Sequence, residues 1–297
     1  MTAARKSRPW SGKTDGLPWM QRSLVVMLRF LPLWLLYGVM ALVLPFYLFL
    51  GKGFRPMYRF FRQGFGFGIP KSLWYVWLNH FQFGQVVLDR FACYAGKRFR
   101  FQTDGMELFR EKEQAADGFV VFSSHAGHYE MAGYALQPER KPMSALVYGA
   151  ESEVIMKNRA TQLMAHHIQM IPVTADLSHL FAVNAALEAG QIVSLPADRI
   201  YGSQKCVDCL FFGKTASFPM GGFALATRKM VEALAVFVMK EGYRSYHIHV
   251  RPVTYDRQAP RNEQVAQLAQ HFVSEMETIL RRYPTQWYNY YDIWKEK

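Results

Sequence analysis

Hydrophobic and polar positions follow two different patterns along this chain. Residues 31–50 contain no charged side chain, and an apolar run of that length is typical of a helix that crosses a bilayer. Beyond residue 100, short runs rich in β-branched and aromatic residues are separated by longer mixed stretches. That alternation is typical of strands connected by helices. The sequence therefore predicts an apolar N-terminal helix followed by an α/β domain.

The pattern also predicts the order of the elements. Strands are expected at 97–101, 118–122, 145–148, 170–173, 191–195, 233–239 and 246–253, and helices at 71–94, 152–167, 177–189, 222–231 and 261–282. Strands that alternate with helices pair in a layered sheet through crossover connections. We therefore expect a mixed, largely parallel sheet flanked by helices.

Four regions follow from these patterns and from the charge distribution. They are a basic flexible tail at 1–22, a hydrophobic membrane-anchoring helix at 23–50, basic and aromatic membrane-proximal helices at 51–100, and the α/β domain at 101–297. A cleaved signal peptide is disfavoured because the apolar run is too long. A buried core helix remains the alternative. Positive charge flanks the run on both sides, so the sequence does not decide whether it spans the membrane or re-enters the same leaflet.

The sharpest change of polarity comes directly after the predicted strand 118–122. The following turn contains His125, and Glu130 lies five positions later. Chemistry in α/β sheets is commonly placed at the carboxyl ends of strands. An imidazole exchanges protons near neutral pH, and a carboxylate at its second nitrogen fixes its tautomer. The alternative is a capped helix start, with Ser124 as the cap and Glu130 in the first turn for dipole reasons.

Polar residues also follow or occupy later strands. Asp198 and Arg199 come directly after the strand 191–195, which would place them on the same rim as His125; a surface turn with an ion pair is the alternative. His247 and His249 alternate along a predicted strand and would therefore share one face. We interpret that face as solvent-exposed.

Composition narrows the choice of partners. The net charge is +12 and the sequence pI about 9.6, which favours an anionic partner such as phospholipid, nucleic acid or an acidic protein. The aromatic share of 15% favours the membrane–water interface. Residues 51–68 interleave Arg with Phe and Tyr, as expected of a belt on anionic lipid, although such a segment can also stack on nucleic-acid bases.

Three cysteines are too few and too odd in number for a disulfide framework, which favours a reducing compartment. Cys206 and Cys209 have the spacing of half a zinc site but no second pair, so we expect no metal there.

Residues 217–222 form a predicted turn into a helix N-terminus, where backbone N–H groups bind phosphate or an oxyanion.

Four ordered blocks make the chain resemble the bacterial lipid A biosynthesis acyltransferases, the lauroyl/myristoyl-transferase branch of the lysophospholipid acyltransferase superfamily. The blocks are the apolar N-terminal segment; TDGMELF at 103–109 followed by FVVFSSHAGHYEMAG; AALEAGQIVSLPADRIYGS at 185–203; and YPTQWYNYYDIW near the end. The resemblance covers most of the chain beyond residue 25. It implies a lysophospholipid acyltransferase-like fold, with an acyltransferase catalytic domain at 101–297.

The resemblance also implies roles for individual residues. His125 would be the general base that removes a proton from the acceptor hydroxyl, and Glu130 its orienting carboxylate. Backbone N–H groups near Gly127 or at 218–222 would hold the tetrahedral oxyanion. The residues assigned to substrate binding are Asp198, Arg199, Arg159, Gly127 and His128.

The implied partners are acyl carrier protein as acyl donor, a lipid acceptor and an anionic membrane, with no nucleic acid, metal or cofactor. The enzyme would lie at the cell inner membrane with its catalytic domain on the cytoplasmic side. The positive charge would serve both the bilayer and the acidic carrier protein.

The acceptor stays open, because the stretch NRATQLMAHHIQM offers only Arg159 where relatives acting on lipid A have several arginines. A lysophospholipid, an amino-acid lipid or an aryl-polyene-type lipid are alternatives, and acyl length and O- versus N-acylation also stay open. Two other classes are a non-catalytic membrane-bound interaction protein and a metal-dependent hydrolase.

Overall fold

The computed structural model describes residues 18–51, 53–147, 153–174, 178–200 and 205–294. Most of the predicted basic tail therefore lies outside the described residues. The first elements are helices: α1 (Pro18–Phe30), α2 (Leu33–Leu50), α3 (Phe54–Gln63) and α4 (Ile69–Tyr94). The later elements are β1 (Arg100–Asp104), α5 (Met106–Gln114), β2 (Phe119–Ser123), the 3-10 helix η1 (Tyr129–Met131), α6 (Ala132–Ala135), β3 (Met143–Val147), α7 (Glu153–Ala165), β4 (Ile168–Pro172), α8 (Ser178–Glu188), β5 (Ile192–Pro196), β6 (Cys206–Phe211), β7 (Lys214–Pro219), α9 (Gly221–Lys229), β8 (Glu232–Gly242), β9 (Ser245–Pro252) and α10 (Arg261–Arg282).

A seven-stranded sheet with the order β1-β9-β8-β2-β5-β3-β4 forms the centre of the molecule. Every neighbouring pair is parallel except β8 and β9, which form an antiparallel hairpin. The predicted mixed, largely parallel sheet is confirmed. In β2 and β5, Ser123 is the register partner of Pro196, so both strands end at the same edge of the sheet.

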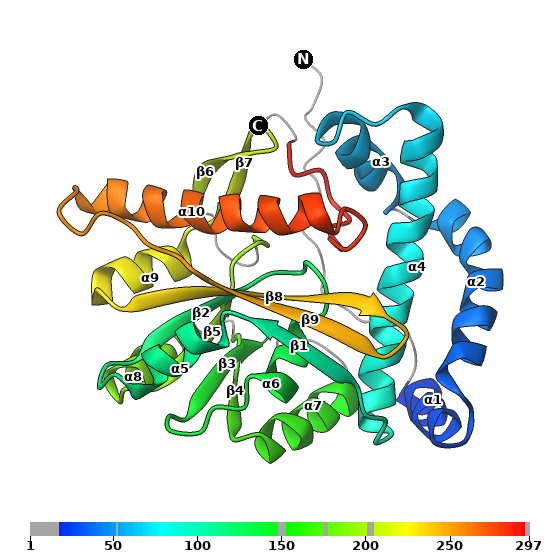
Figure 1. The fold of residues 1–297 in the computed structure, drawn as a ribbon, viewed down its shortest axis with the longest axis horizontal. Helices are drawn as coiled ribbons and strands as arrows, with labels where there is room; N and C mark the ends of the chain where they lie inside the picture. The colour runs from blue at the N-terminus through cyan, green and yellow to red at the C-terminus, as the bar shows by residue number, and fades with distance from the viewer. Residues whose placement is uncertain (1–17, 52, 148–152, 175–177, 201–204, 295–297) are drawn as a thin grey trace.

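Two hydrophobic cores cover the two faces of this sheet. In β2, Val120 and Phe122 belong to the core that includes α8, α9 and α10, while Phe119 and Val121 belong to the core that includes α5 and α7. Figure 1 shows α10 along one side of the sheet and α6 and α7 on the other. A parallel strand buried on both faces reads as a continuous apolar run, which explains why β2 was predicted from the sequence.

Several elements differ from the prediction. The first strand begins at Arg100 rather than residue 97, and helix α5 was not predicted. The hairpin β6–β7 was not predicted. Its two-residue connection, Phe212 and Gly213, has positive φ at both positions, as in the primed turns that favour hairpins. The ring of Phe212 packs on Phe60 and Phe65, which helps to hold this unusual backbone.

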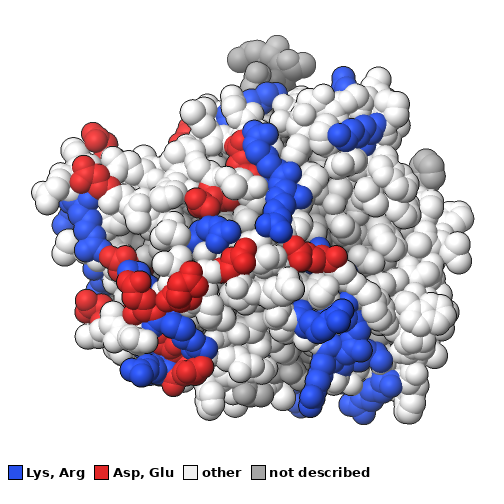
Figure 2. Space-filling model, viewed as in Figure 1, with Lys and Arg blue, Asp and Glu red and all other residues white. Residues whose placement is uncertain are grey.

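The apolar N-terminal segment forms two helices rather than one. α1 ends at Phe30 and α2 begins after Pro32, because proline disfavours a helical residue before it. Among the described residues, no helix combines the length and apolar character that crossing a membrane requires. The predicted membrane-anchoring helix is therefore not confirmed. Few charged side chains lie over the right-hand side of the molecule, where Figure 1 places α2 (Figure 2).

Helices α3 and α4 share their packing with the later part of the chain. Phe60, Phe61 and Val76 belong to the same core as α10. A buried ionic cluster adds a second connection, since Asp89 of α4 lies 2.6 Å from the Nζ atom of Lys240 in β8. The hydroxyl groups of Tyr37 in α2 and Tyr246 in β9 also donate to Asp89. Residues on both sides of position 100 thus pack as one body.

Candidate active site

His125 and Asp198 meet at the carboxyl ends of β2 and β5. His125 lies two residues after β2, and Asp198 lies two residues after β5. The Nδ1 atom of His125 is 2.8 Å from Oδ1 of Asp198, and the backbone N–H of His125 donates to Oδ2 at 2.8 Å. The prediction that both residues occupy one rim of the sheet is confirmed. Their direct pairing was not predicted.

Asp198 is fully buried and held by several donors. The indole Nε1–H of Trp287 donates to its Oδ2 atom at 3.2 Å, and the hydroxyl of Tyr291 donates to its backbone carbonyl at 3.1 Å. Burial alone would raise the pKa of the Asp198 carboxyl, but His125 and Arg199 outweigh it and keep that pKa below its usual value. Asp198 is therefore a fixed carboxylate that only accepts hydrogen bonds.

The protonation state and the tautomer of the His125 imidazole depend on burial, on Arg199 and on Asp198. Burial and the nearby positive charge of Arg199 lower the pKa of His125, and Asp198 offsets this only in part. The ring is therefore neutral near pH 7. Because Asp198 can only accept, the single ring proton lies on Nδ1 and Nε2 keeps its lone pair. The side chain is 21% exposed, so His125 has the protonation and the access to solvent of a general base.

Glu130 does not have the position that the sequence analysis expected. Its Oε1 atom lies 2.7 Å from the Nη2 atom of buried Arg159 and 3.0 Å from the Nη2 atom of partly buried Arg90. Burial raises the pKa of Glu130, but Arg159 and Arg90 outweigh it and lower that pKa to about 2. The carboxylate at Nδ1 of His125 is thus Asp198 rather than Glu130, because the chain turns between His125 and η1 and directs Glu130 toward α4 and α7.

Gly127 causes this turn and does not offer a free donor. Its φ is +69°, and a side chain at this position would collide with the carbonyl of Val238. Its N–H donates to the carbonyl of Gln286 at 2.6 Å, and the N–H of His128 donates to the carbonyl of Val238 at 2.7 Å. These two amides therefore hold the turn against β8 and the C-terminal segment. Both amides are thus engaged within the protein, and the binding role expected of Gly127 and His128 stays a prediction.

The four other predicted binding residues are also engaged within the protein. The buried ring of His128 packs edge-on against Tyr246, and burial lowers its pKa to about 3. Arg159 is buried beside Glu130, and Arg199 donates to the carbonyl of Tyr288. Asp198 orients His125 rather than facing solvent. These contacts give the four residues a place in the framework of the site, and their direct contact with a substrate stays a prediction.

The C-terminal segment contributes residues that the sequence analysis did not assign to the site. Besides the contacts of Trp287 and Tyr291 with Asp198, the N–H of Tyr288 donates to the carbonyl of His125 at 3.1 Å. The block YPTQWYNYYDIW was recognised in the sequence, but no periodicity indicates that it reaches a strand end more than 150 positions earlier. Arg90 was also missed, because a single charge within an aromatic helix carries no signal of its partner.

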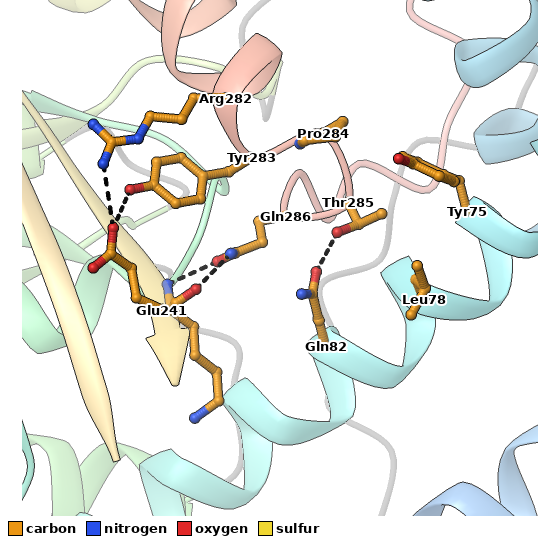
Figure 3. A pocket seen from close by; sticks show the side chains of 10 residues that line it. Tyr75, Leu78, Gln82, Glu241, Arg282, Tyr283, Pro284, Thr285 and Gln286 are labelled. Carbon is orange, nitrogen blue, oxygen red and sulfur yellow. Dashed lines mark hydrogen bonds and ion pairs between the residues drawn. The ribbon is translucent and has the colours of Figure 1, made fainter. Parts of the chain in front are cut away.

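A cavity of about 520 Å³ lies between α4, the end of β8 and the segment after α10 (Figure 3). Its lining includes Tyr75, Gln82, Glu241 and Tyr283 but not His125. A second space of about 350 Å³ borders His166 and His167. Neither lining identifies the path of a substrate to His125. Residues 201–204, which follow Arg199 in the third sequence block, lie outside the described residues.

A comparison with protein families adds an independent finding. Residues 95–296 match the family described as bacterial lipid A biosynthesis acyltransferase. The chain belongs to this family. The match begins at the end of α4 and includes every described strand as well as His125 and Asp198. No curated protein sequence matches the chain closely enough to add to this comparison.

Membership in this family identifies the protein as an acyltransferase. A reaction of this class needs an acyl donor and, for this family, a lipid acceptor. The pair of partly exposed His125 and buried Asp198 lies inside the matched segment and has the geometry of a base with an orienting carboxylate. The family match therefore supports acyl transfer, and the contact between His125 and Asp198 lies within the matched residues.

Proposed function

We propose that this lipid A acyltransferase family member transfers a fatty acyl chain from an acyl thioester, carried on acyl carrier protein, to a hydroxyl group of a membrane lipid. His125 acts as the general base. The observation that carries this proposal is the 2.8 Å contact between Nδ1 of His125 and the buried carboxylate of Asp198. That contact leaves Nε2 as the basic nitrogen of a partly exposed ring.

The reaction begins with proton removal. Nε2 of His125 takes the proton of the acceptor hydroxyl while the oxygen attacks the thioester carbonyl, and a tetrahedral oxyanion forms. Asp198 stabilises the imidazolium that results, as the third member of a catalytic triad does. Collapse of the intermediate breaks the carbon–sulfur bond, and the imidazolium returns its proton to the departing thiolate. The ester and the free thiol are the products.

The oxyanion needs hydrogen-bond donors outside the turn of His125, whose amides at Gly127 and His128 are engaged. The first turn of α9 is the remaining candidate from the sequence analysis. Gly222 in this turn packs beside Phe122 and Leu195, which belong to the strands that carry the rim. Helix N-termini stabilise negative charge through their backbone N–H groups and dipole.

The lipid acceptor and the acyl donor explain two surface features. Large apolar side chains of α1 and α2 are exposed, including Phe30, Trp34, Leu42 and Phe46, and such a surface favours contact with the apolar boundary of a bilayer. The net charge of +12 favours an anionic membrane and the acidic carrier protein. We place the enzyme at the cell inner membrane with its catalytic domain on the cytoplasmic side.

Acyl transfer from radiolabelled acyl carrier protein tests the proposal. Membranes that contain the wild type should produce a labelled lipid, whose mobility identifies the acceptor among lipid A precursors, lysophospholipids and amino-acid lipids. His125→Ala should reduce the rate by roughly 10²–10⁴-fold, the usual contribution of general base catalysis. His271→Ala, on the exposed side of α10, serves as the control. Equal rates for wild type and His125→Ala would contradict the catalytic assignment.

If well-expressed wild type forms no labelled lipid with several acyl lengths and lipid extracts, acyl transfer from this donor is contradicted. The same assay with acyl coenzyme A then tests the nature of the thioester. Formation of product only with acyl coenzyme A would overturn acyl carrier protein as the donor while keeping the role of His125.

A further inference from the structure

A second group of polar side chains lies at the β1 edge of the sheet and shares no residue with the His125 site. It consists of Asp104 at the end of β1 and His247 and His249 in β9. β1 pairs with β9 in parallel, and Asp104 is the register partner of His249. The two histidines are separated by one residue, so their side chains point to the same face of the strand.

The sequence analysis expected this face to be exposed, and that expectation is wrong. His249 is fully buried and His247 nearly so, while Asp104 is 47% exposed. The two imidazole rings lie against each other, with their centroids 4.2 Å apart. The group is therefore enclosed on the histidine side and open to solvent at Asp104.

Glu241 and Tyr283 fix which nitrogen of each histidine carries the proton. The hydroxyl of Tyr283 donates to Oε1 of Glu241 at 2.5 Å (Figure 3), and Nδ1 of His247 lies 3.2 Å from the same oxygen. A carboxylate accepts only, so the proton of a neutral His247 is on Nδ1. Because the hydroxyl hydrogen of Tyr283 points to Glu241, the hydroxyl oxygen of Tyr283 accepts a hydrogen bond from Nε2 of His249 at 3.3 Å.

This relay leaves Nε2 of His247 and Nδ1 of His249 with their lone pairs. Both atoms face the carboxylate of Asp104, at 3.0 and 3.4 Å. Neither forms a hydrogen bond of acceptable geometry with any residue that the structure describes. Three acceptor groups thus converge on one point, an arrangement that requires positive charge between them. The charge is supplied either by extra protons on the imidazoles or by a metal ion.

The distances suit a metal ion. One ligand atom from each of the three residues lies within 4.8 Å of the others, and ligands of a tetrahedral zinc ion are separated by roughly 3.3 Å when bonds are about 2.0–2.1 Å. Two imidazoles and one carboxylate favour zinc and similar transition metals over Mg²⁺ or Ca²⁺, which prefer oxygen ligands. A carboxylate on the second nitrogen, as Glu241 provides for His247, is the usual support of a ligating histidine.

Two arginines belong to the same surroundings. An Nη2 atom of Arg282 is 3.5 Å from Glu241, and one of Arg251 is 4.0 Å from Asp104. They balance the two carboxylates and will weaken binding of a cation, but each contact is longer than the 3.0 and 3.4 Å that separate the histidine nitrogens from Asp104. Half-exposed Asp104 offers an entry path from solvent.

We propose that Asp104, His247 and His249 bind a divalent transition metal ion, of which Zn²⁺ is the best fit, at a site separate from His125. Asp104 contributes a carboxylate oxygen, His247 its Nε2 atom and His249 its Nδ1 atom, and water completes the coordination. Glu241 and Tyr283 position the two imidazoles. The ion would join the edge strand β1 to β9 beside the cavity that Glu241 and Tyr283 line.

Zinc binding to the purified, tag-free, full-length protein tests this proposal. After treatment with a chelator, equilibrium dialysis against Zn²⁺ at neutral pH should give saturable binding of one ion per chain, with excess Mg²⁺ present. Asp104→Asn and His247→Gln should each weaken binding by at least roughly tenfold, since even residues that only support a ligand contribute 10–100-fold. Asp104 is half-exposed, so its variant should keep the melting temperature of the zinc-free wild type.

The control is His271→Ala. His271 lies 3.9 Å from Glu275 on the surface of α10, so it matches a histidine–carboxylate pair that belongs to no three-ligand group among the described residues. Its zinc affinity should equal that of the wild type. Absence of stoichiometric binding in the wild type, or unchanged affinity in both Asp104→Asn and His247→Gln, would overturn the proposal.

Discussion

Two carboxylates with little exposure to solvent, Asp198 and Glu130, lie near the turn after β2, and they serve different purposes. Asp198 contacts a neutral imidazole and two further donors, whereas Glu130 contacts the guanidinium groups of Arg90 and Arg159. The first arrangement sets the tautomer of His125. The second neutralises charge inside the protein and ties η1 to α4 and α7. Proximity to His125 in the sequence therefore does not decide which carboxylate binds its imidazole.

The largest expected effect concerns the unit formed by His125 and Asp198. If Asp198 acts only through His125, the double variant His125→Ala/Asp198→Asn should lose no more activity than His125→Ala, about 10²–10⁴-fold. Initial rates of acyl transfer at equal amounts of folded enzyme measure this. A multiplicative loss in the double variant would show that Asp198 acts independently of His125.

The next effect concerns Glu130. Glu130→Ala leaves the guanidinium groups of buried Arg159 and partly buried Arg90 without their carboxylate, and loss of one partner of a buried ion pair costs about 3–5 kcal/mol of stability. The free energy of unfolding, or the melting temperature in detergent, should therefore fall strongly. Arg59→Ala is the control, because Arg59 pairs with Asp292 at an exposed position and such pairs contribute little. Equal stability of both variants would contradict the structural role of Glu130.

The pH dependence of activity tests the lowered pKa of His125. The pKa of His125 is held below its usual value by burial and by Arg199, and the base works only when neutral. Activity should therefore persist as pH falls below about 6.5, the usual pKa of histidine, and decline only near the lowered pKa. The acid limb of a kcat/KM profile reports this directly.

The pH profile of kcat/KM also tests the contribution of Arg199 to the pKa of His125. Arg199→Gln removes a charge that lowers the pKa of His125, so the acid limb should move to higher pH. Glu130→Gln, which changes a carboxylate paired with Arg90 and Arg159 rather than with His125, should move the limb less. An unchanged or lowered limb in Arg199→Gln would contradict the electrostatic account of His125.

The smallest expected effect concerns the support of Asp198. Tyr291 donates to the backbone carbonyl of Asp198 at 3.1 Å, and loss of one such hydrogen bond costs about 1 kcal/mol. Tyr291→Phe should therefore lower the melting temperature slightly and leave the acid limb unchanged, since the carboxylate itself keeps its donors. A loss of activity as large as that of His125→Ala would show that Tyr291 has a further role.

Sequence patterns predicted the sheet better than the site. The strands β2, β5 and β8 are buried on both faces, so their apolar runs identified them without tertiary information. The rule that chemistry follows strand ends also brought His125 and Asp198 to one rim. Which carboxylate meets the imidazole depends on the positive φ of Gly127 and the turn it permits, and no spacing in the sequence encodes that choice.

The buried histidines illustrate the same limit. Alternation in β9 correctly placed His247 and His249 on one face, but burial of that face depends on Tyr283, which the chain brings back after α10. The division of the apolar N-terminal segment into α1 and α2 was signalled by Pro32, yet hydrophobicity alone predicted one helix. Local patterns thus specify elements, and the partners of polar side chains require the tertiary fold.

The central claim is that Asp198, not Glu130, is the carboxylate that orients His125. The most direct test compares kcat for acyl transfer by two isosteric variants, Asp198→Asn and Glu130→Gln, at equal amounts of folded protein. We expect a loss of roughly 10²–10⁴-fold for Asp198→Asn and a kcat near that of the wild type for Glu130→Gln, despite its lower stability. Full activity of Asp198→Asn together with an inactive, folded Glu130→Gln would contradict the account.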